Sequence, residues 1–135
     1  GHAESVRVRF DPARIDYETL VRFFFEIHDP TTLNRQHLDV GPQYRSGLFT
    51  TTESQATTAH TVIDELKNGK AFDGRKIVTE VESATTFFPA EQYHQDYVAR
   101  TGRACHPGIG TAVEAYQAKL AKKEFDTSNK EATEQ

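Results

Sequence analysis

The sequence predicts an α+β fold: a partial sheet with helices on one face, long loops and a disordered C-terminal tail. Segments with strand-like alternation and segments with helical periodicity follow one another along the first 82 residues. The length of 135 residues is typical of one domain with a modest core. The last residues are charged and poor in large apolar side chains, which favours disorder.

The first three elements follow from periodicity and from residues that begin or end structure. Ser5–Phe10 alternates apolar and polar residues strictly, which predicts a half-buried strand. Asp16 is a good N-cap residue, and the helical spacing after it predicts a helix over Tyr17–His28. That helix must end before Pro30, because the residue preceding a proline is disfavoured in helical conformation. Gly47–Thr51 is the second predicted strand.

The next elements complete a strand, helix, strand, helix, strand order. Thr52 is suited to cap a second helix, which Gly69 closes. Asp73-Gly74 predicts a turn, and Lys76–Glu82 is the third predicted strand.

The C-terminal part reads as shorter elements and a tail. Pro89 is placed to begin a short helix that carries Tyr93, His94 and Tyr97 on one face. A glycine-containing loop over Gly102–Gly110, a helix over Thr111–Lys123 and a tail over Asp126–Gln135 are expected to follow.

Composition excludes several classes of function. A net charge of −4 argues against nucleic acid or an anionic membrane as the main partner. The longest apolar run, Phe23–Phe25, is far too short to span a bilayer, and no signal-like segment opens the chain. A single cysteine excludes an internal disulfide and is typical of a reducing compartment, so we expect the cytoplasm.

A polar loop, Asn34–Ser46, separates the first helix from the second strand. It contains almost no Lys or Glu and instead concentrates hydrogen-bonding groups of fixed shape around a Gly-Pro pair. Asp39 and Tyr44 in this loop, with Glu4 before the first strand, are candidate site residues. A carboxylic acid between apolar walls can stay protonated and donate a proton, and a tyrosine hydroxyl can bind a polarised oxygen. Solvated carboxylates at strand ends are, however, commoner than catalytic ones.

The histidines and the cysteine suggest two further chemistries. The six histidines show no His-x-x-x-His spacing, so surface or hydrogen-bonded roles are favoured over a metal site. Cys105 lies near Arg100, Arg103 and His106, which would favour its thiolate if they approach it, although a lone cysteine is more often inert.

Several segments together resemble the A type of peptide-methionine sulfoxide reductase, from Gly1 to about Cys105. They are "GHAESVRVRFDP", "FFEIHDPTTLNRQHLDVGPQYRSGLF", "KIVTEVE" and "FFPAEQYHQDYVAR". The most specific is the loop motif Asn-Arg-Gln-x-x-Asp-x-Gly-x-Gln-Tyr-Arg-Ser.

The resemblance implies a ferredoxin-like two-layer sandwich, with residues 1–110 as a partial reductase domain and 111–135 as a C-terminal helix and tail. It implies that Glu4 protonates the sulfoxide oxygen and that Asp39 and Tyr44 line the substrate pocket. His94 and Tyr97 belong to a signature read as structural support. No cofactor is implied, and no metal; thioredoxin or another dithiol would be the external reductant.

The chain departs from the family in one large respect. The family nucleophile lies in a Gly-Cys-Phe-Trp motif upstream of the equivalent of Gly1, and the 135 residues contain no such motif. Cys105 stands where the family carries a recycling cysteine. Three interpretations therefore stay open. The first is a reductase whose nucleophile lies outside this chain, so that the chain alone is inactive and needs a partner, the missing N-terminal segment or a second copy that covers its open edge. The second is a non-catalytic truncated homologue that binds methionine sulfoxide or a protein partner. The third is a small metal-binding module.

Overall fold

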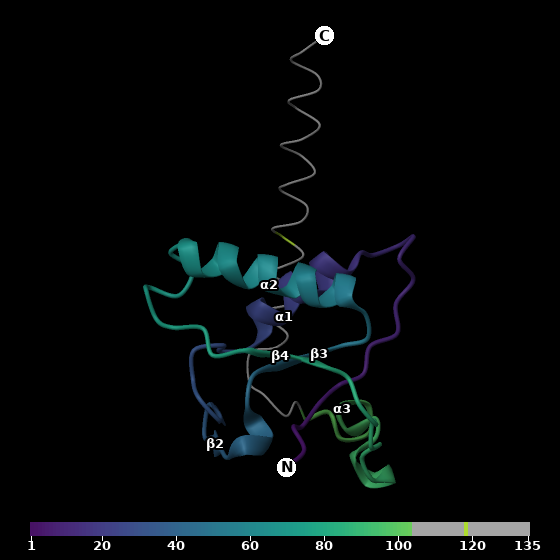
Figure 1. Ribbon diagram of the computed structural model, residues 1–135. Helices are drawn as coiled ribbons and strands as arrows, with labels where there is room; N and C mark the ends of the chain where they lie inside the picture. Colours follow the sequence, from purple (N-terminus) through teal and green to yellow (C-terminus); the bar gives the residue numbers. More distant parts are fainter. Residues whose placement is uncertain (104–117, 119–135) are drawn as a thin grey trace. The chain divides into compact units, whose positions relative to one another are not determined.

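A computed structural model describes residues 1–103 and residue 118 (Figure 1). The chain divides into two compact units, Gly1–Phe87 and a second that begins at Phe88. The first unit holds two helices and two small sheets, which confirms the α+β prediction.

Helix α1 spans Tyr17–Ile27, and its N-cap is the predicted Asp16, whose Oδ1 accepts a hydrogen bond from the Thr19 amide at 2.7 Å. His28 is its C-cap, one residue before the Asp29-Pro30 break. Helix α2 spans Glu53–Asn68 and is capped by Thr52, whose hydroxyl accepts from the Gln55 amide. The cap residues therefore fix both helix starts where the sequence predicts them.

Strand β3 (Gly47–Thr50) and strand β4 (Glu80–Ser83) pair in parallel, with Leu48 opposite Val81. The intervening helix α2 is the crossover that a parallel pair requires. Figure 1 shows α1 and α2 on the same side of this pair. A separate antiparallel hairpin, β1 (Arg35–Gln36) and β2 (Asp39–Val40), lies within the polar loop.

The core lies between the two helices and the β3–β4 pair. Val21 and Phe25 of α1 meet Val62 and Ile63 of α2, with Ile77 completing the cluster. Apolar side chains surround it at partial burial: Tyr17, Phe24, Leu48, Leu66, Phe72 and Val81. The apolar residues that recur at helical spacing on α1 and α2 therefore face the core.

The predicted strand Ser5–Phe10 is not formed. No described strand pairs with this segment, and Val6 and Val8 are 88% and 58% exposed. Alternation marks a segment able to be a strand, but a strand also needs a neighbour to receive its backbone hydrogen bonds. The third predicted strand, Lys76–Glu82, forms later than expected, at Glu80–Ser83, because the backbone before it bonds outside the sheet: the Val78 amide donates to the Pro30 carbonyl at 2.8 Å.

The described part of the second unit contains a 3-10 turn, η2 (Gln92–His94), and a short helix, α3 (Tyr97–Thr101). The single helix predicted from Pro89 is therefore wrong: Asp96, with φ of 52°, interrupts it, and His94 and Tyr97 lie in different elements. Arg100 holds the interruption by donating to the carbonyls of Tyr93 and Gln95.

Other expectations fall on residues that the structure does not describe. The Thr111–Lys123 helix, the Asp126–Gln135 tail, most of the Gly102–Gly110 loop and Cys105 lie outside the described residues. Within the described part of the chain, no helix has the length and apolar content needed to cross a bilayer.

Candidate functional site

The polar loop is folded by hydrogen bonds among its own side chains and backbone. The two-residue turn of the β1–β2 hairpin begins at His37, with φ of 53°. Arg35 Nε donates to the His37 carbonyl at 2.8 Å, and the Gly41 amide donates to the Asn34 carbonyl at 2.8 Å. Gly41 has φ of 149°, a conformation that strongly favours glycine. The fixed-shape groups that the sequence concentrates here therefore build the loop itself.

The side chain of Gln36 joins this loop to the end of α1. Its amide nitrogen donates to the Asp29 carbonyl at 2.7 Å, and its amide oxygen accepts from the Asp29 amide at 3.2 Å. The Asp29 carboxylate in turn accepts from the amide and hydroxyl of Thr31 at 2.9 and 2.6 Å. Burial would raise the pKa of Asp29, but these bonds and the nearby Arg75 guanidinium outweigh it and lower that pKa.

Glu4 is attached to the same loop through its backbone. Its amide donates to the Gln43 carbonyl at 2.8 Å, in the 3-10 turn η1 (Pro42–Tyr44), and Arg45 donates to the Gly1 carbonyl at 3.4 Å. Two predicted site residues, Glu4 and Tyr44, are therefore brought to neighbouring backbone positions. Tyr44 is half-buried, whereas the side chain of Glu4 is exposed, so the apolar walls expected around this acid are not formed by the described residues.

Asp39 lies in strand β2 with an exposed side chain. The hairpin connects it to η1, three residues before Pro42, so it lies on the same loop as Tyr44. The loop thus presents Asp39 and Tyr44 on one folded segment, with the chain of Glu4 held against its end.

A buried hydroxyl at the end of the loop forms a node that sequence reasoning missed. Ser46 is 4% exposed, and its Oγ lies 2.7 Å from His28 Nε2 and 2.7 Å from Thr79 Oγ1. The node joins the end of α1, the start of β3 and the residue before β4. His28 and Ser46 are 18 positions apart in the sequence, and Ser46 and Thr79 are 33 apart, so no local sequence pattern predicts the node.

The protonation state of His28 follows from its partners. Its Nδ1 lies 2.6 Å from the Phe24 carbonyl, which can only accept, so Nδ1 carries a hydrogen. Desolvation is the largest influence and lowers the pKa of His28, against the Phe24 carbonyl and the Asp29 charge, which raise it. In the neutral ring Nε2 is then an acceptor, so Ser46 donates to it and Thr79 donates to Ser46.

The predicted supporting residues His94 and Tyr97 are not on one helical face. The His94 ring instead stacks against Tyr93, with ring centroids 4.2 Å apart. Side-chain hydrogen bonding to Glu91 is the main cause that raises the pKa of Tyr93. Both His94 and Tyr97 lie in the second unit, whereas the Asp39–Tyr44 loop lies in the first.

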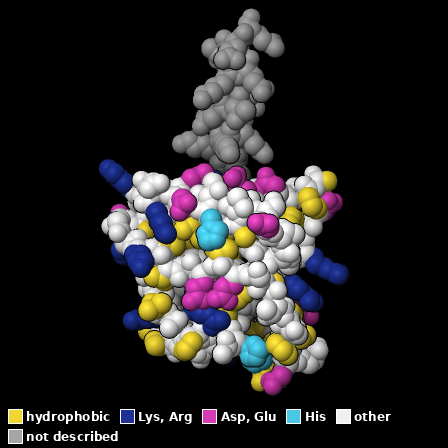
Figure 2. All heavy atoms as spheres, in the orientation of Figure 1, with side chains coloured by type: hydrophobic (Ala, Val, Ile, Leu, Met, Phe, Trp, Pro, Cys, Tyr) yellow, Lys and Arg dark blue, Asp and Glu magenta, His cyan; other side chains and the backbone are white. Residues whose placement is uncertain are grey.

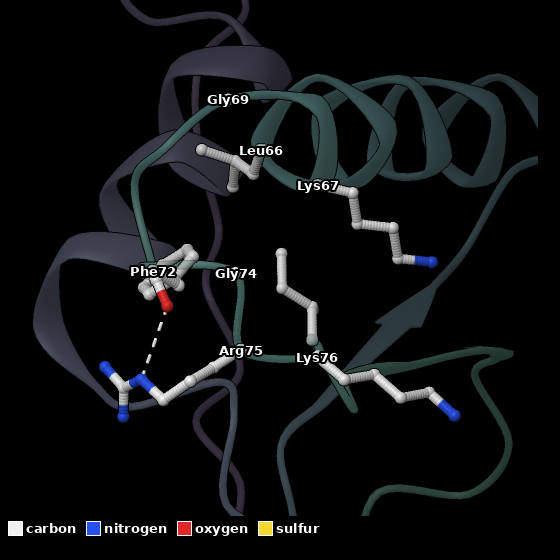
Figure 3. Close-up of a pocket in the computed structure, with 8 residues that line it drawn as sticks. Leu66, Lys67, Gly69, Phe72, Gly74, Arg75 and Lys76 are labelled. Carbon is white, nitrogen blue, oxygen red and sulfur yellow. Dashed lines mark hydrogen bonds between the residues drawn. The ribbon is translucent and has the colours of Figure 1, made fainter.

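Other surfaces offer less chemistry. A pocket of about 320 Å³ opens between the end of α2 and the loop before β4, lined in part by Leu66, Phe72 and Ile77 (Figure 3). Lys67 and Lys76 extend to the same side of it, while Arg75 is turned to the Phe72 carbonyl. The pocket contains no predicted site residue. Acidic and basic side chains share the face in Figure 2, with apolar atoms between them.

The part of the chain that the structure describes contains no cluster of metal-ligating side chains. There, no three His, Cys, Asp or Glu side chains come close enough together to hold an ion. The hydroxyl, imidazole, guanidinium and carboxylate groups that converge near residues 45 and 46 bond to one another.

The described residues thus form an α+β domain whose polar loop holds the backbone of an acidic residue, Glu4. Residues 1–126 match the family model for peptide methionine sulfoxide reductase. The chain belongs to that family.

Named relatives agree with this assignment. The chain is 49% identical over 122 residues to the peptide methionine sulfoxide reductase MsrA of Deinococcus radiodurans, covering 90% of this chain and 56% of the relative. It is 54% identical over 100 residues to MsrA of Chromobacterium violaceum, covering 74% and 56%. The chain therefore spans a little more than half the length of these relatives.

Solved structures show the same fold. Mxr1 of Saccharomyces cerevisiae, in reduced form, superposes with a TM-score of 0.66 at 35% identity, covering 72% of this chain and 52% of that one. Methionine sulfoxide reductase A of Corynebacterium diphtheriae gives 0.64 at 31% identity, covering 73% and 50%.

Proposed function

We propose that this chain supplies the oxygen-binding part of a peptide-methionine (S)-S-oxide reductase. Its substrate is methionine S-sulfoxide, in proteins or as the free amino acid, and the nucleophilic cysteine lies outside these 135 residues. The observation that carries the proposal is the family match over residues 1–126, taken with a polar loop that holds the chain of Glu4 beside Tyr44.

The chemistry assigns a role to each group. A thiolate attacks the sulfoxide sulfur while Glu4 donates a proton to the sulfoxide oxygen, and the new S–S bond then breaks as the hydroxyl passes from that sulfur to the cysteine sulfur. The products are the methionine thioether and a cysteine sulfenic acid, which carries the oxygen. Asp39 and Tyr44 hold the oxygen while the bond breaks. Because Glu4 is exposed here, the proposal requires the missing part of the site to cover it.

The catalytic cycle then needs external electrons. A second thiol condenses with the sulfenic acid to a disulfide and releases water, and a dithiol such as thioredoxin reduces that disulfide. Cys105 is the candidate recycling thiol in this chain. This chemistry requires no metal or organic cofactor and suits a reducing compartment such as the cytoplasm.

A fusion protein tests the proposal. The segment of the Deinococcus relative that this chain does not match is joined upstream of Gly1, and N-acetyl-methionine S-sulfoxide is supplied with dithiothreitol. We expect turnover, and we expect Glu4→Gln to slow it by roughly 10²–10⁴-fold, the usual contribution of a general acid. Glu53→Gln, an exposed acid on α2, is the matched control and should change little.

Each outcome separates the interpretations. A loss of less than threefold in Glu4→Gln removes this residue from the mechanism. A folded but inactive fusion contradicts the reductase proposal. If the unfused chain then still binds the sulfoxide in an NMR titration, it favours the non-catalytic homologue. Cys105→Ser should leave turnover with dithiothreitol unchanged and abolish turnover with thioredoxin if this cysteine recycles the enzyme.

A further inference from the structure

We propose that His28 is a positioning residue that sets the loop Gly41–Ser46 through its hydrogen bond to Ser46, and that its protonation loosens that loop. The inference deepens the proposed function, on which it rests for the role of Tyr44. None of the hydrogen bonds described above joins His28 directly to Glu4, Asp39 or Tyr44.

The geometry places His28 between two fixed points. On one side, its Nδ1–H donates to the Phe24 carbonyl in the last turn of α1 at 2.6 Å. On the other, its Nε2 accepts from the Ser46 hydroxyl at 2.7 Å. The ring also lies against Phe24, with centroids 4.0 Å apart. The imidazole therefore ties the end of a packed helix to the end of the polar loop.

Several bonds carry this attachment from Ser46 back to the predicted site. The Ser46 carbonyl accepts from the Glu80 amide at 3.0 Å, and Arg45 Nε pairs with the Glu80 carboxylate at 3.3 Å. The same Arg45 side chain donates to the Pro42 carbonyl at 2.9 Å, at the first residue of η1. The next carbonyl, that of Gln43, receives the Glu4 amide. A shift at Ser46 is therefore passed to both Tyr44 and Glu4.

Protonation of His28 reverses the donor and acceptor roles in the hydrogen bonds that link His28, Ser46 and Thr79. Nε2–H would donate to Ser46, and Ser46 would donate to Thr79, whose hydroxyl would then lose its acceptor. The charged ring would also remain half-buried beside Phe24 and Phe25. The charged groups near His28 are the Asp29 carboxylate, which already bonds to Thr31 and Arg75, and the Arg45–Glu80 ion pair. Arg45 and Glu80 are the sequence neighbours of Ser46 and Thr79.

The competing explanation is that His28 only fills space at the end of α1. A space-filling residue would tolerate any ring or chain of similar size and would not couple the loop to pH. A glutamine at position 28 separates the two explanations, because its amide oxygen can accept from Ser46 but does not titrate. His60, exposed on α2, supplies the matched control.

The test follows backbone amide signals of the full chain by NMR from pH 8 to pH 5, with no ligand added. We expect the Tyr44, Arg45 and Glu4 amides to titrate together with the His28 ring. His28→Gln should abolish that titration while keeping the pH 8 positions, and His60→Gln should leave it intact. Ser46→Ala, which removes the link but not the imidazole, should also abolish it.

The result that overturns the inference is a His28 ring that titrates while the three amides stay still, or a loop titration that survives in His28→Gln or Ser46→Ala. If His28→Gln does not fold, the wild-type chain and Ser46→Ala still decide. Activity of the fusion protein reports separately: a coupled loop in an inactive fusion keeps the positioning inference and rejects the proposed function.

Discussion

Replacing Ser46 with alanine should destabilise the chain by about 2 kcal/mol. The hydroxyl is 4% exposed and makes two hydrogen bonds of 2.7 Å, to His28 and Thr79. Each such bond contributes about 1 kcal/mol net, and leaving a buried partner unsatisfied costs about 1–3 kcal/mol. The estimate stays at the lower end because both partners are only half-buried and water can replace part of what is lost.

Urea denaturation monitored by circular dichroism at pH 7.5 measures this change. The slope of the unfolding free energy with urea should stay constant while the midpoint falls. Ser54→Ala, an exposed serine in the first turn of α2, is the matched control and should lie within about 0.5 kcal/mol of the wild type. A double-mutant cycle with Thr79→Val should show a coupling energy of at least about 0.5 kcal/mol. If Ser46→Ala lowers the unfolding free energy no more than Ser54→Ala does, the hydrogen bonds of Ser46 do not stabilise the chain and the reasoning is refuted.

Two further predictions concern pH and the core. Because burial lowers the pKa of His28, the unfolded chain binds more protons below about pH 6.5, so the unfolding free energy should fall as pH drops from there, by at most about 1.4 kcal/mol per pH unit. Urea midpoints between pH 8 and 5 measure the slope, which should diminish in His28→Gln; an unchanged slope would assign it to other groups. Val62 is fully buried in the core that α1 and α2 share, so Val62→Ala should lower the unfolding free energy by about 2–3 kcal/mol. The exposed Arg22–Glu65 pair should contribute under about 1 kcal/mol, which Arg22→Ala in the same denaturation assay measures.

The exposure of Glu4 limits how much of the site this chain forms. Its amide donates to the Gln43 carbonyl, but its side chain is exposed to solvent. Val6 and Val8, two and four positions further on, are exposed as well. The described residues therefore leave the acid and the alternating segment open to solvent.

The sequence by itself determined what depends on neighbours along the chain. Asp16 and Thr52 placed the starts of α1 and α2, because an N-cap acts on amides two or three residues away. Asp73-Gly74 placed a turn with positive φ at both residues. The loop motif around Asp39 and Tyr44 identified the family, since it is a specific run of residues.

Only the tertiary structure decided what depends on distant partners. Ser5–Phe10 has the alternation of a strand but no neighbouring strand, and a strand exists only as a pair. His28, Ser46 and Thr79 are ordinary residues in the sequence and become a node only because α1, β3 and the approach to β4 meet there. Caps and turns are local and can be read in order, whereas ladders and buried hydroxyl chains join segments whose meeting is settled by packing of the core.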